Sequence, residues 1–263
     1  MTKVLFFFSI FILFSKILIS NVFAAPTFVH GFSVNSQETN PAGLAFSSDG
    51  TKMFHVGNIM SGNHAKTNAD VFEYALSTPW DVSSATYVDA FSVIDEMKVD
   101  NQSSLPYGIT FNNDGTQMYV SDYGITDSIY QYTLSRAYDV STASYANKSI
   151  DVDAKVGSAN RGPCGIRFNN DGTKLFMTGF YSDYINEYAL TTAYDISTAS
   201  YSGDSERFYV NSQDTAPRDV QFNLDGTRMF VMGGAGDDIN EYTLSTGFDV
   251  STASFVDSYD VSS

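Results

Sequence analysis

Short hydrophobic runs separated by turn-forming residues recur along the chain from residue 41 onward. The first runs, at 43–46, 53–56, 71–76 and 87–93, each predict a β-strand, because they have the length and the alternation typical of strands. An Asp-Gly pair follows the first run of each stretch and predicts a tight hairpin, since glycine accepts a positive φ without steric cost. These pairs are Asp49-Gly50, Asp114-Gly115, Asp171-Gly172 and Asp225-Gly226. No segment after residue 40 has a helical period, so we expect an all-β fold.

The same pattern occurs four times, in copies that open at Pro41, Pro106, Pro163 and Pro217. Each copy predicts four strands, and its third strand is followed by an aspartate that we expect to form an Asx turn (Asp81, Asp139, Asp195 and Asp249). Repeated four-stranded antiparallel units predict a β-propeller of four blades, arranged as a closed ring or an open arc. Recurring aromatic residues should pack between the blades: Phe46, Phe111, Phe168 and Phe222, and Phe54, Tyr119, Phe176 and Phe230.

The second copy carries a family resemblance. Its segments 106–109 (PYGI), 113–116 (NDGT) and 119–122 (YVSD) resemble the Pro-x-Gly, Asp-Gly and Tyr-Val-Thr-Asn elements of YVTN/lactonase-type β-propeller repeats, which have WD40- and NHL-like blades. The resemblance extends over residues 41 to 263 and implies a propeller. It implies no single function, because propellers of this kind act as enzymes, binding modules and scaffolds.

The N-terminal segment predicts a signal peptide over residues 1–24. Lys3 precedes an apolar run, Val4–Phe14, and Val22-Phe23-Ala24 provides a cleavage site after Ala24. Lys16 interrupts the apolar stretch, which makes it a poor membrane span. We therefore expect a secreted or periplasmic β-propeller domain over residues 25–263.

Residues 28–36 resemble the segment that begins at Phe208, so they predict an extra outer strand. The chain then has five outer strands for four sets of inner strands. We expect Val29–Asn35 to pair near the last blade as a closing strand. A homodimer that forms a larger ring and a longer repeat array are the alternatives.

The charge balance excludes two kinds of partner. The chain has 14 Lys and Arg against 30 Asp and Glu, a formal net charge of −16. Binding to nucleic acid requires clustered basic residues, and anionic membranes attract the same residues, so neither partner is expected after signal cleavage. The single cysteine, Cys164, excludes an internal disulfide.

Residues that differ between copies are the best candidates for a site, since residues shared by all copies build the blades. The innermost strands and their entry loops contribute Arg161, Arg167, Arg218, Asp219 and Gln221 to the mouth of the channel. Arginine forks bind carboxylates and phosphates, which favours a small anionic or sugar-like ligand. The alternative is that these arginines and Asp219 only pair with one another.

No cofactor is expected, with Ca²⁺ as the alternative. Loop acids could supply its oxygen ligands, although they lack a recognised spacing: Asp122, Asp127, Asp183, Asp237 and Asp238. The three histidines, His30, His55 and His64, also lack the spacing of metal ligands.

Because no catalytic constellation is visible, the sequence favours an exported binding module for a protein or glycan. The alternative is a lactonase-like hydrolase that acts at the central channel and could depend on a metal.

Overall fold

The computed structural model describes residues 28–57, 70–93, 105–124, 127–152 and 162–262. These residues form four antiparallel sheets, each built from consecutive strands and called blades 1 to 4 here. Blade 1 contains β1 (Pro41–Phe46), β2 (Lys52–Gly57), β3 (Asp70–Leu76) and β4 (Ala85–Ser92); blade 2 contains β5 (Pro106–Phe111), β6 (Gln117–Asp122), β7 (Ser128–Leu134) and β8 (Ala143–Asp151). Blade 3 contains β9 (Pro163–Phe168), β10 (Lys174–Gly179), β11 (Tyr184–Leu190), β12 (Ala199–Tyr201) and β13 (Phe208–Tyr209); blade 4 contains β14 (Pro217–Phe222), β15 (Arg228–Gly233), β16 (Asp238–Leu244) and β17 (Ala253–Asp260).

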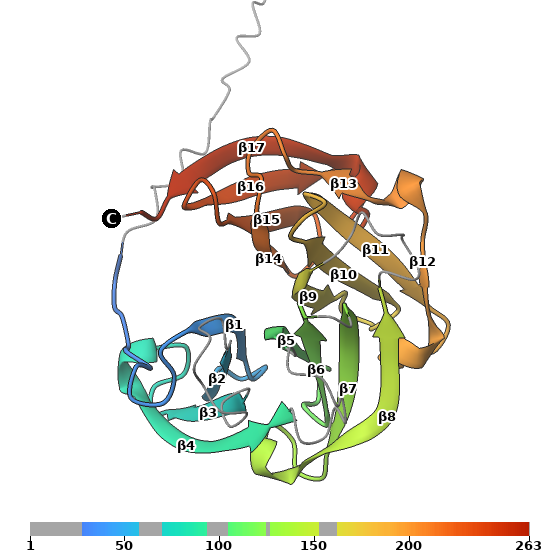
Figure 1. The fold of residues 1–263 in the computed structure, drawn as a ribbon. Helices are drawn as coiled ribbons and strands as arrows, with labels where there is room; N and C mark the ends of the chain where they lie inside the picture. Colours follow the sequence, from blue (N-terminus) through green and yellow to red (C-terminus); the bar gives the residue numbers. More distant parts are fainter. Residues whose placement is uncertain (1–27, 58–69, 94–104, 125–126, 153–161, 263) are drawn as a thin grey trace, which may run out of the picture.

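The blades are arranged around a central axis, with β1, β5, β9 and β14 innermost, so the fold is the expected four-bladed β-propeller (Figure 1). Recurring aromatic residues pack across each junction, as predicted. The ring centroids of Phe54 and Phe111 are 4.6 Å apart, those of Tyr119 and Phe168 are 4.7 Å apart, and those of Phe176 and Phe222 are 4.6 Å apart. Blades 2 and 3 are therefore each covered by a neighbouring blade on both faces.

The predicted turns form as their local chemistry requires. The glycines of the four Asp-Gly pairs have φ between 70° and 73°, and each preceding aspartate accepts a hydrogen bond from the threonine N–H two residues later. Short 3-10 helices follow the third strand of each blade. Asp81, Asp195 and Asp249 accept the N–H of a serine at the start of these helices. Asp139 instead accepts from the hydroxyl of Ser141 at 2.5 Å.

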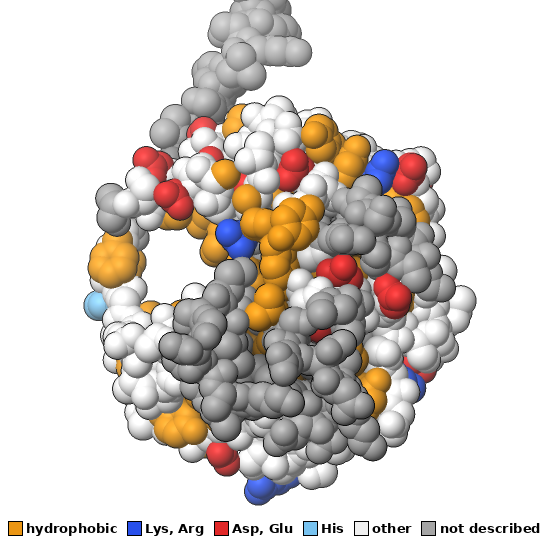
Figure 2. All heavy atoms as spheres, viewed as in Figure 1, with side chains coloured by type: hydrophobic (Ala, Val, Ile, Leu, Met, Phe, Trp, Pro, Cys, Tyr) orange, Lys and Arg blue, Asp and Glu red, His pale blue; other side chains and the backbone are white. Residues whose placement is uncertain are grey.

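Residues 28–40 do not form the extra outer strand that the sequence predicts, and they do not pair with the last blade. They contain no strand and pack against blade 1, where the rings of Phe32 and Tyr74 are 5.6 Å apart and Val34 contacts the core. This segment crosses an opening between blade 4 and blade 1, which is visible in both views (Figures 1 and 2).

The predicted signal peptide lies outside the described residues. Within the residues that the structure describes, no helix is long and apolar enough to span a membrane.

Candidate functional site

Three of the residues predicted for the channel meet on the inner strands of blades 3 and 4. Arg167 of β9 places Nη2 3.6 Å from Oδ2 of Asp219 on β14, and Nε2 of Gln221 donates to the same oxygen at 3.0 Å. The Val220 N–H donates to Oδ1 of Asp219 at 2.9 Å, and Nη1 of Arg167 reaches the Thr110 hydroxyl of β5 at 3.4 Å. This inner-strand group (Thr110, Arg167, Asp219 and Gln221) joins three blades at the axis.

The position of Asp219 in the repeat explains how it fits. The equivalent residues of the other blades are Gly43, Gly108 and Gly165, and a Cβ on Gly108 would lie 2.2 Å from the carbonyl oxygen of Cys164 on the next inner strand. Glycine is therefore required wherever one inner strand packs against the next. Blade 4 is the last blade that the structure describes, and on β14 this position carries a side chain. A Cβ on Gly165 would lie 2.3 Å from Oδ1 of Asp219, so the absence of a side chain at Gly165 makes room for the carboxylate.

Burial and neighbouring groups act on Asp219 in opposite directions. The side chains of Arg167 and Asp219 are 19% and 21% exposed. Burial raises the pKa of Asp219, whereas the Arg167 charge and the bonds from Gln221 and Val220 oppose this rise. A carboxylate whose pKa is raised by burial and that is held beside a guanidinium is typical of general acids and bases.

Arg218 belongs to a second group, formed by aromatic side chains from blades 2 and 3. Its Nη1 donates to the Tyr107 hydroxyl at 2.8 Å, and its guanidinium lies 4.4 Å from the ring centroid of Phe180. Tyr123 stacks on Tyr181 at 5.7 Å and donates to its hydroxyl at 2.7 Å. We call these residues the aromatic cluster (Tyr107, Tyr123, Phe180, Tyr181 and Arg218). Figure 2 shows hydrophobic side chains beside a basic side chain near the middle of one face.

The two groups are neighbours, because Arg218 and Asp219 are consecutive on β14. Burial raises the pKa of Tyr107, and the charges of both Arg218 and Asp219 act on its hydroxyl. Sequence reasoning identified the arginine but did not predict the aromatic partners of Arg218. Tyr107 follows the opening proline of its copy, where the other copies have Ala42, Cys164 and Arg218. Phe180 and Tyr181 follow β10 in a turn.

The other sequence candidates have structural partners or lie elsewhere. Arg161 and His64 lie outside the described residues. His55 is buried in blade 1, where its ring stacks on Phe72 and Nε2 lies 3.1 Å from the Tyr74 hydroxyl. Cys164 is fully buried, and burial raises the pKa of its thiol, which keeps it protonated.

The acids proposed for Ca²⁺ accept hydrogen bonds from other groups of the protein. Asp122 accepts from the Leu105 and Gly124 N–H groups, and Asp127 accepts from the Gly162 N–H at 2.8 Å. Asp183 accepts from the side chain of Asn211, and Asp238 accepts from Asn240, both at 2.7 Å. These bonds give each of the four acids a hydrogen-bond partner within the fold.

No family model and no curated protein sequence matches the chain. Solved structures match in fold at low identity. A protein from Lactobacillus plantarum matches with a TM-score of 0.51 and 14% identity over 84% of this chain and 57% of that one. A protein of unknown function from Desulfotomaculum acetoxidans matches with a TM-score of 0.50 and 13% identity over 84% and 56%.

The periplasmic gluconolactonase of Pseudomonas aeruginosa matches with a TM-score of 0.50 and 16% identity over 84% of this chain and 54% of that one. This chain therefore aligns with little more than half of each of these three structures. At such identities the likeness concerns the fold alone, and it is a likeness to β-propellers.

Proposed function

We propose that the protein binds a small sugar lactone between the inner-strand group and the aromatic cluster, and hydrolyses it there. The observation that carries this proposal is Asp219, a half-buried carboxylate on an inner strand, held beside Arg167 and next to Arg218. The resemblance in fold to a periplasmic gluconolactonase is consistent with it.

The chemistry needs a base and a positive charge at one place. In this proposal the Asp219 carboxylate accepts a proton from a water molecule while the water oxygen bonds to the lactone carbonyl carbon. The guanidinium groups beside Asp219, those of Arg167 and Arg218, stabilise the negative charge that develops on the carbonyl oxygen. The ring C–O bond then breaks, the departing oxygen takes up the proton, and a hydroxy acid is released.

The aromatic cluster would provide the contact surface for the sugar ring. Tyr181 is 64% exposed and stacks on Tyr123, so an aromatic face is available to the apolar face of a sugar. Arg218 lies beside these rings and suits the carboxylate of the product.

Lactone hydrolysis can be measured directly as acid release from δ-gluconolactone and related aldonolactones, with the spontaneous rate subtracted. We expect Asp219→Asn, which keeps the shape of the side chain, to lower kcat by about 10²- to 10⁴-fold. Asp257→Asn changes an exposed acid of the outer strand β17 and should leave the rate unchanged. Because Asp219 must be ionised to act, the rate should rise with pH through a pKa above its ordinary value of 3.8.

Non-catalytic glycan binding at the same surface is the second candidate, and the exposed ring of Tyr181, stacked on Tyr123, favours it. Calorimetric titration with gluconate and with neutral oligosaccharides separates the two functions. Binding that Tyr181→Ala removes, without lactone turnover, would establish a binding module. Absence of both turnover and binding would end the proposal.

Export is part of the same proposal, because residues 1–24 predict a signal peptide. N-terminal sequencing of protein recovered after expression with its native N-terminus should begin at Ala25. A mature chain that still begins at Met1 would contradict export by cleavage.

A further inference from the structure

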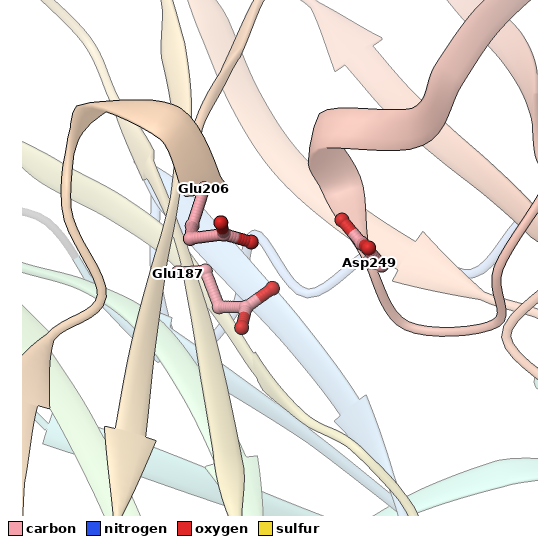
Figure 3. A group of neighbouring side chains, drawn as sticks. All are labelled: Glu187, Glu206 and Asp249. Carbon is pink, nitrogen blue, oxygen red and sulfur yellow. The ribbon is translucent and has the colours of Figure 1, made fainter.

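Three carboxylates gather at the junction between blades 3 and 4. Glu187 lies on β11, Glu206 lies in η5 (Asp204–Glu206), and Asp249 precedes η6 (Val250–Thr252). One oxygen from each lies within 4.8 Å of the others, and Figure 3 shows the three side chains pointing toward one another. We call this group the carboxylate cluster.

The junction between blades 1 and 2 shows the same position with every carboxylate oxygen paired. Between blades 1 and 2, Glu73 occupies the position of Glu187. Its Oε1 pairs with Nζ of Lys52 at 2.7 Å, and its Oε2 accepts the Val140 N–H of the next blade at 3.0 Å. Both oxygens of this buried carboxylate are therefore satisfied.

The junction between blades 3 and 4 keeps only half of this arrangement. Lys174 places Nζ 2.8 Å from Oε1 of Glu187, as Lys52 does for Glu73. Oε2 of Glu187, however, has no hydrogen-bond partner among the described residues, although Glu187 is only 3% exposed. A buried carboxylate oxygen without a partner is costly, which indicates that a positive group belongs beside it.

The junction between blades 2 and 3 shows where that positive group would lie. Gln131 replaces the glutamate there and accepts the Ile196 N–H at 3.2 Å. Lys148, which is paired with Gln131 across β7 and β8, places Nζ 2.7 Å from Oδ2 of Asp195, the counterpart of Asp249. At this junction the protein supplies its own cation next to the aspartate.

At the junction between blades 3 and 4, an insertion in blade 3 places a negative charge where the preceding junction has the Lys148 ammonium. Residues 202–207 separate β12 from β13, and they bring Glu206 beside Glu187 and Asp249. The adjacent Arg207 is directed elsewhere, since it pairs with Asp204 at 3.4 Å and lies 4.0 Å from the ring centroid of Tyr184. Three carboxylates and one ammonium, that of Lys174, leave a formal charge of −2.

We propose that a hard divalent cation, Ca²⁺ in the first instance, binds between Glu187, Glu206 and Asp249. A separation of up to 4.8 Å between the carboxylate oxygens suits a Ca²⁺ ion with Ca–O distances of about 2.3–2.6 Å. Glu206 and Asp249 are partly exposed, so water can complete the coordination. The ion would fix the insertion of blade 3 to the first turn of η6 in blade 4.

Metal content and thermal stability test the site in the intact protein after treatment with EDTA and dialysis. Ca²⁺ at about 100 times its Kd should raise Tm by about 5–10 °C. Equilibrium dialysis with elemental analysis should find one more bound Ca²⁺ in the wild type than in Glu206→Gln. Glu187→Gln should also lose this ion and still fold, because blade 2 carries Gln131 at the same position.

Two further variants keep the test independent of folding. Asp204→Asn removes an acid of the same turn that pairs with Arg207, and it should bind Ca²⁺ like the wild type. Glu206→Lys imitates Lys148, so it should remove the Ca²⁺ response and raise Tm in the absence of metal toward that of the Ca²⁺-loaded wild type. No bound ion in the wild type, or an equal loss in Asp204→Asn and Glu206→Gln, would overturn the proposal.

Discussion

At the scale of single residues, the hairpin glycines are held by both backbone and packing. Gly115 has φ of 71°, and a Cβ on it would lie 2.2 Å from Cδ2 of Tyr138. Gly115→Ala should therefore lower the free energy of unfolding by about 2–4 kcal/mol, which urea denaturation would measure. Gly31→Ala is the control, because Gly31 lacks a positive φ and its nearest neighbour would be 3.5 Å away. Equal effects of the two substitutions would contradict this account.

The aspartates of the same turns predict how stability depends on pH. Hydrogen bonds from Thr51 and Ser47 lower the pKa of Asp49 to about 2, and bonds from the equivalent threonines lower the pKa of Asp114, Asp171 and Asp225. The ionised form is thus favoured by the folded state. The contribution of these ionised aspartates to folding stability is complete above the ordinary pKa of 3.8 and is lost as the pH falls toward 2.

Replacing these four aspartates with asparagine tests that dependence, because an asparagine oxygen can accept the same bonds and cannot be protonated in this range. The decrease in Tm between pH 5 and pH 2 should be shallower in the fourfold variant than in the wild type. An unchanged slope would mean that other carboxylates govern acid unfolding.

Residues also show where sequence reasoning succeeds. The Asp-Gly turns were predictable because all of their determinants lie within a few residues. The pairing of Arg167 with Asp219 and Gln221 was only an expectation of proximity, since it depends on two blades. The contact of Arg218 with Tyr107 and Phe180 joins three blades, and no local pattern indicates which aromatic residue will meet it.

At the scale of the blade, equivalent aromatic positions differ in burial according to whether a described neighbouring blade covers them. Phe176 is fully buried against Phe222 of the next blade. Phe230 holds the same position in blade 4 and is only partly buried. Phe176→Ala should cost about 3–5 kcal/mol of unfolding free energy, and Phe230→Ala no more than about 1.5 kcal/mol. Urea denaturation compares the two, and similar costs would show that Phe230 is covered in solution.

The missing outer strand has an explanation at the same scale. Residues 28–36 resemble the segment from Phe208 onward, and both keep one turn: Gln37 N–H bonds to Val34 O as Gln213 N–H bonds to Val210 O. Phe208 and Tyr209 form a strand because β11 of their own blade pairs with them. Residues 28–36 have the sequence of such a strand, but none of the four described blades pairs with them.

For the whole molecule, the sequence predicts the number of blades and leaves their closure open. Each junction is built from contacts between neighbouring repeats, so the same residues can form an arc or part of a larger ring. The described residues leave an opening, and apolar side chains lie at its two sides. Leu44 of β1 is 44% exposed and Met232 of β15 is 47% exposed, whereas their counterparts Ile109 and Thr178 are buried.

These edges are complementary, because at the junction between blades 1 and 2 the counterparts of Met232 and Leu44, which are Val56 and Ile109, belong to one core cluster. We therefore expect the isolated protein to associate head to tail, with blade 4 of one copy against blade 1 of the next. Sedimentation velocity should give an apparent mass of twice that of one chain, and this mass should decrease on dilution. Met232→Glu should shift it toward the monomer, while Val88→Glu, on the exposed outer strand β4, should not. A single monomeric species at every concentration would mean that the two edges stay open or close on one another.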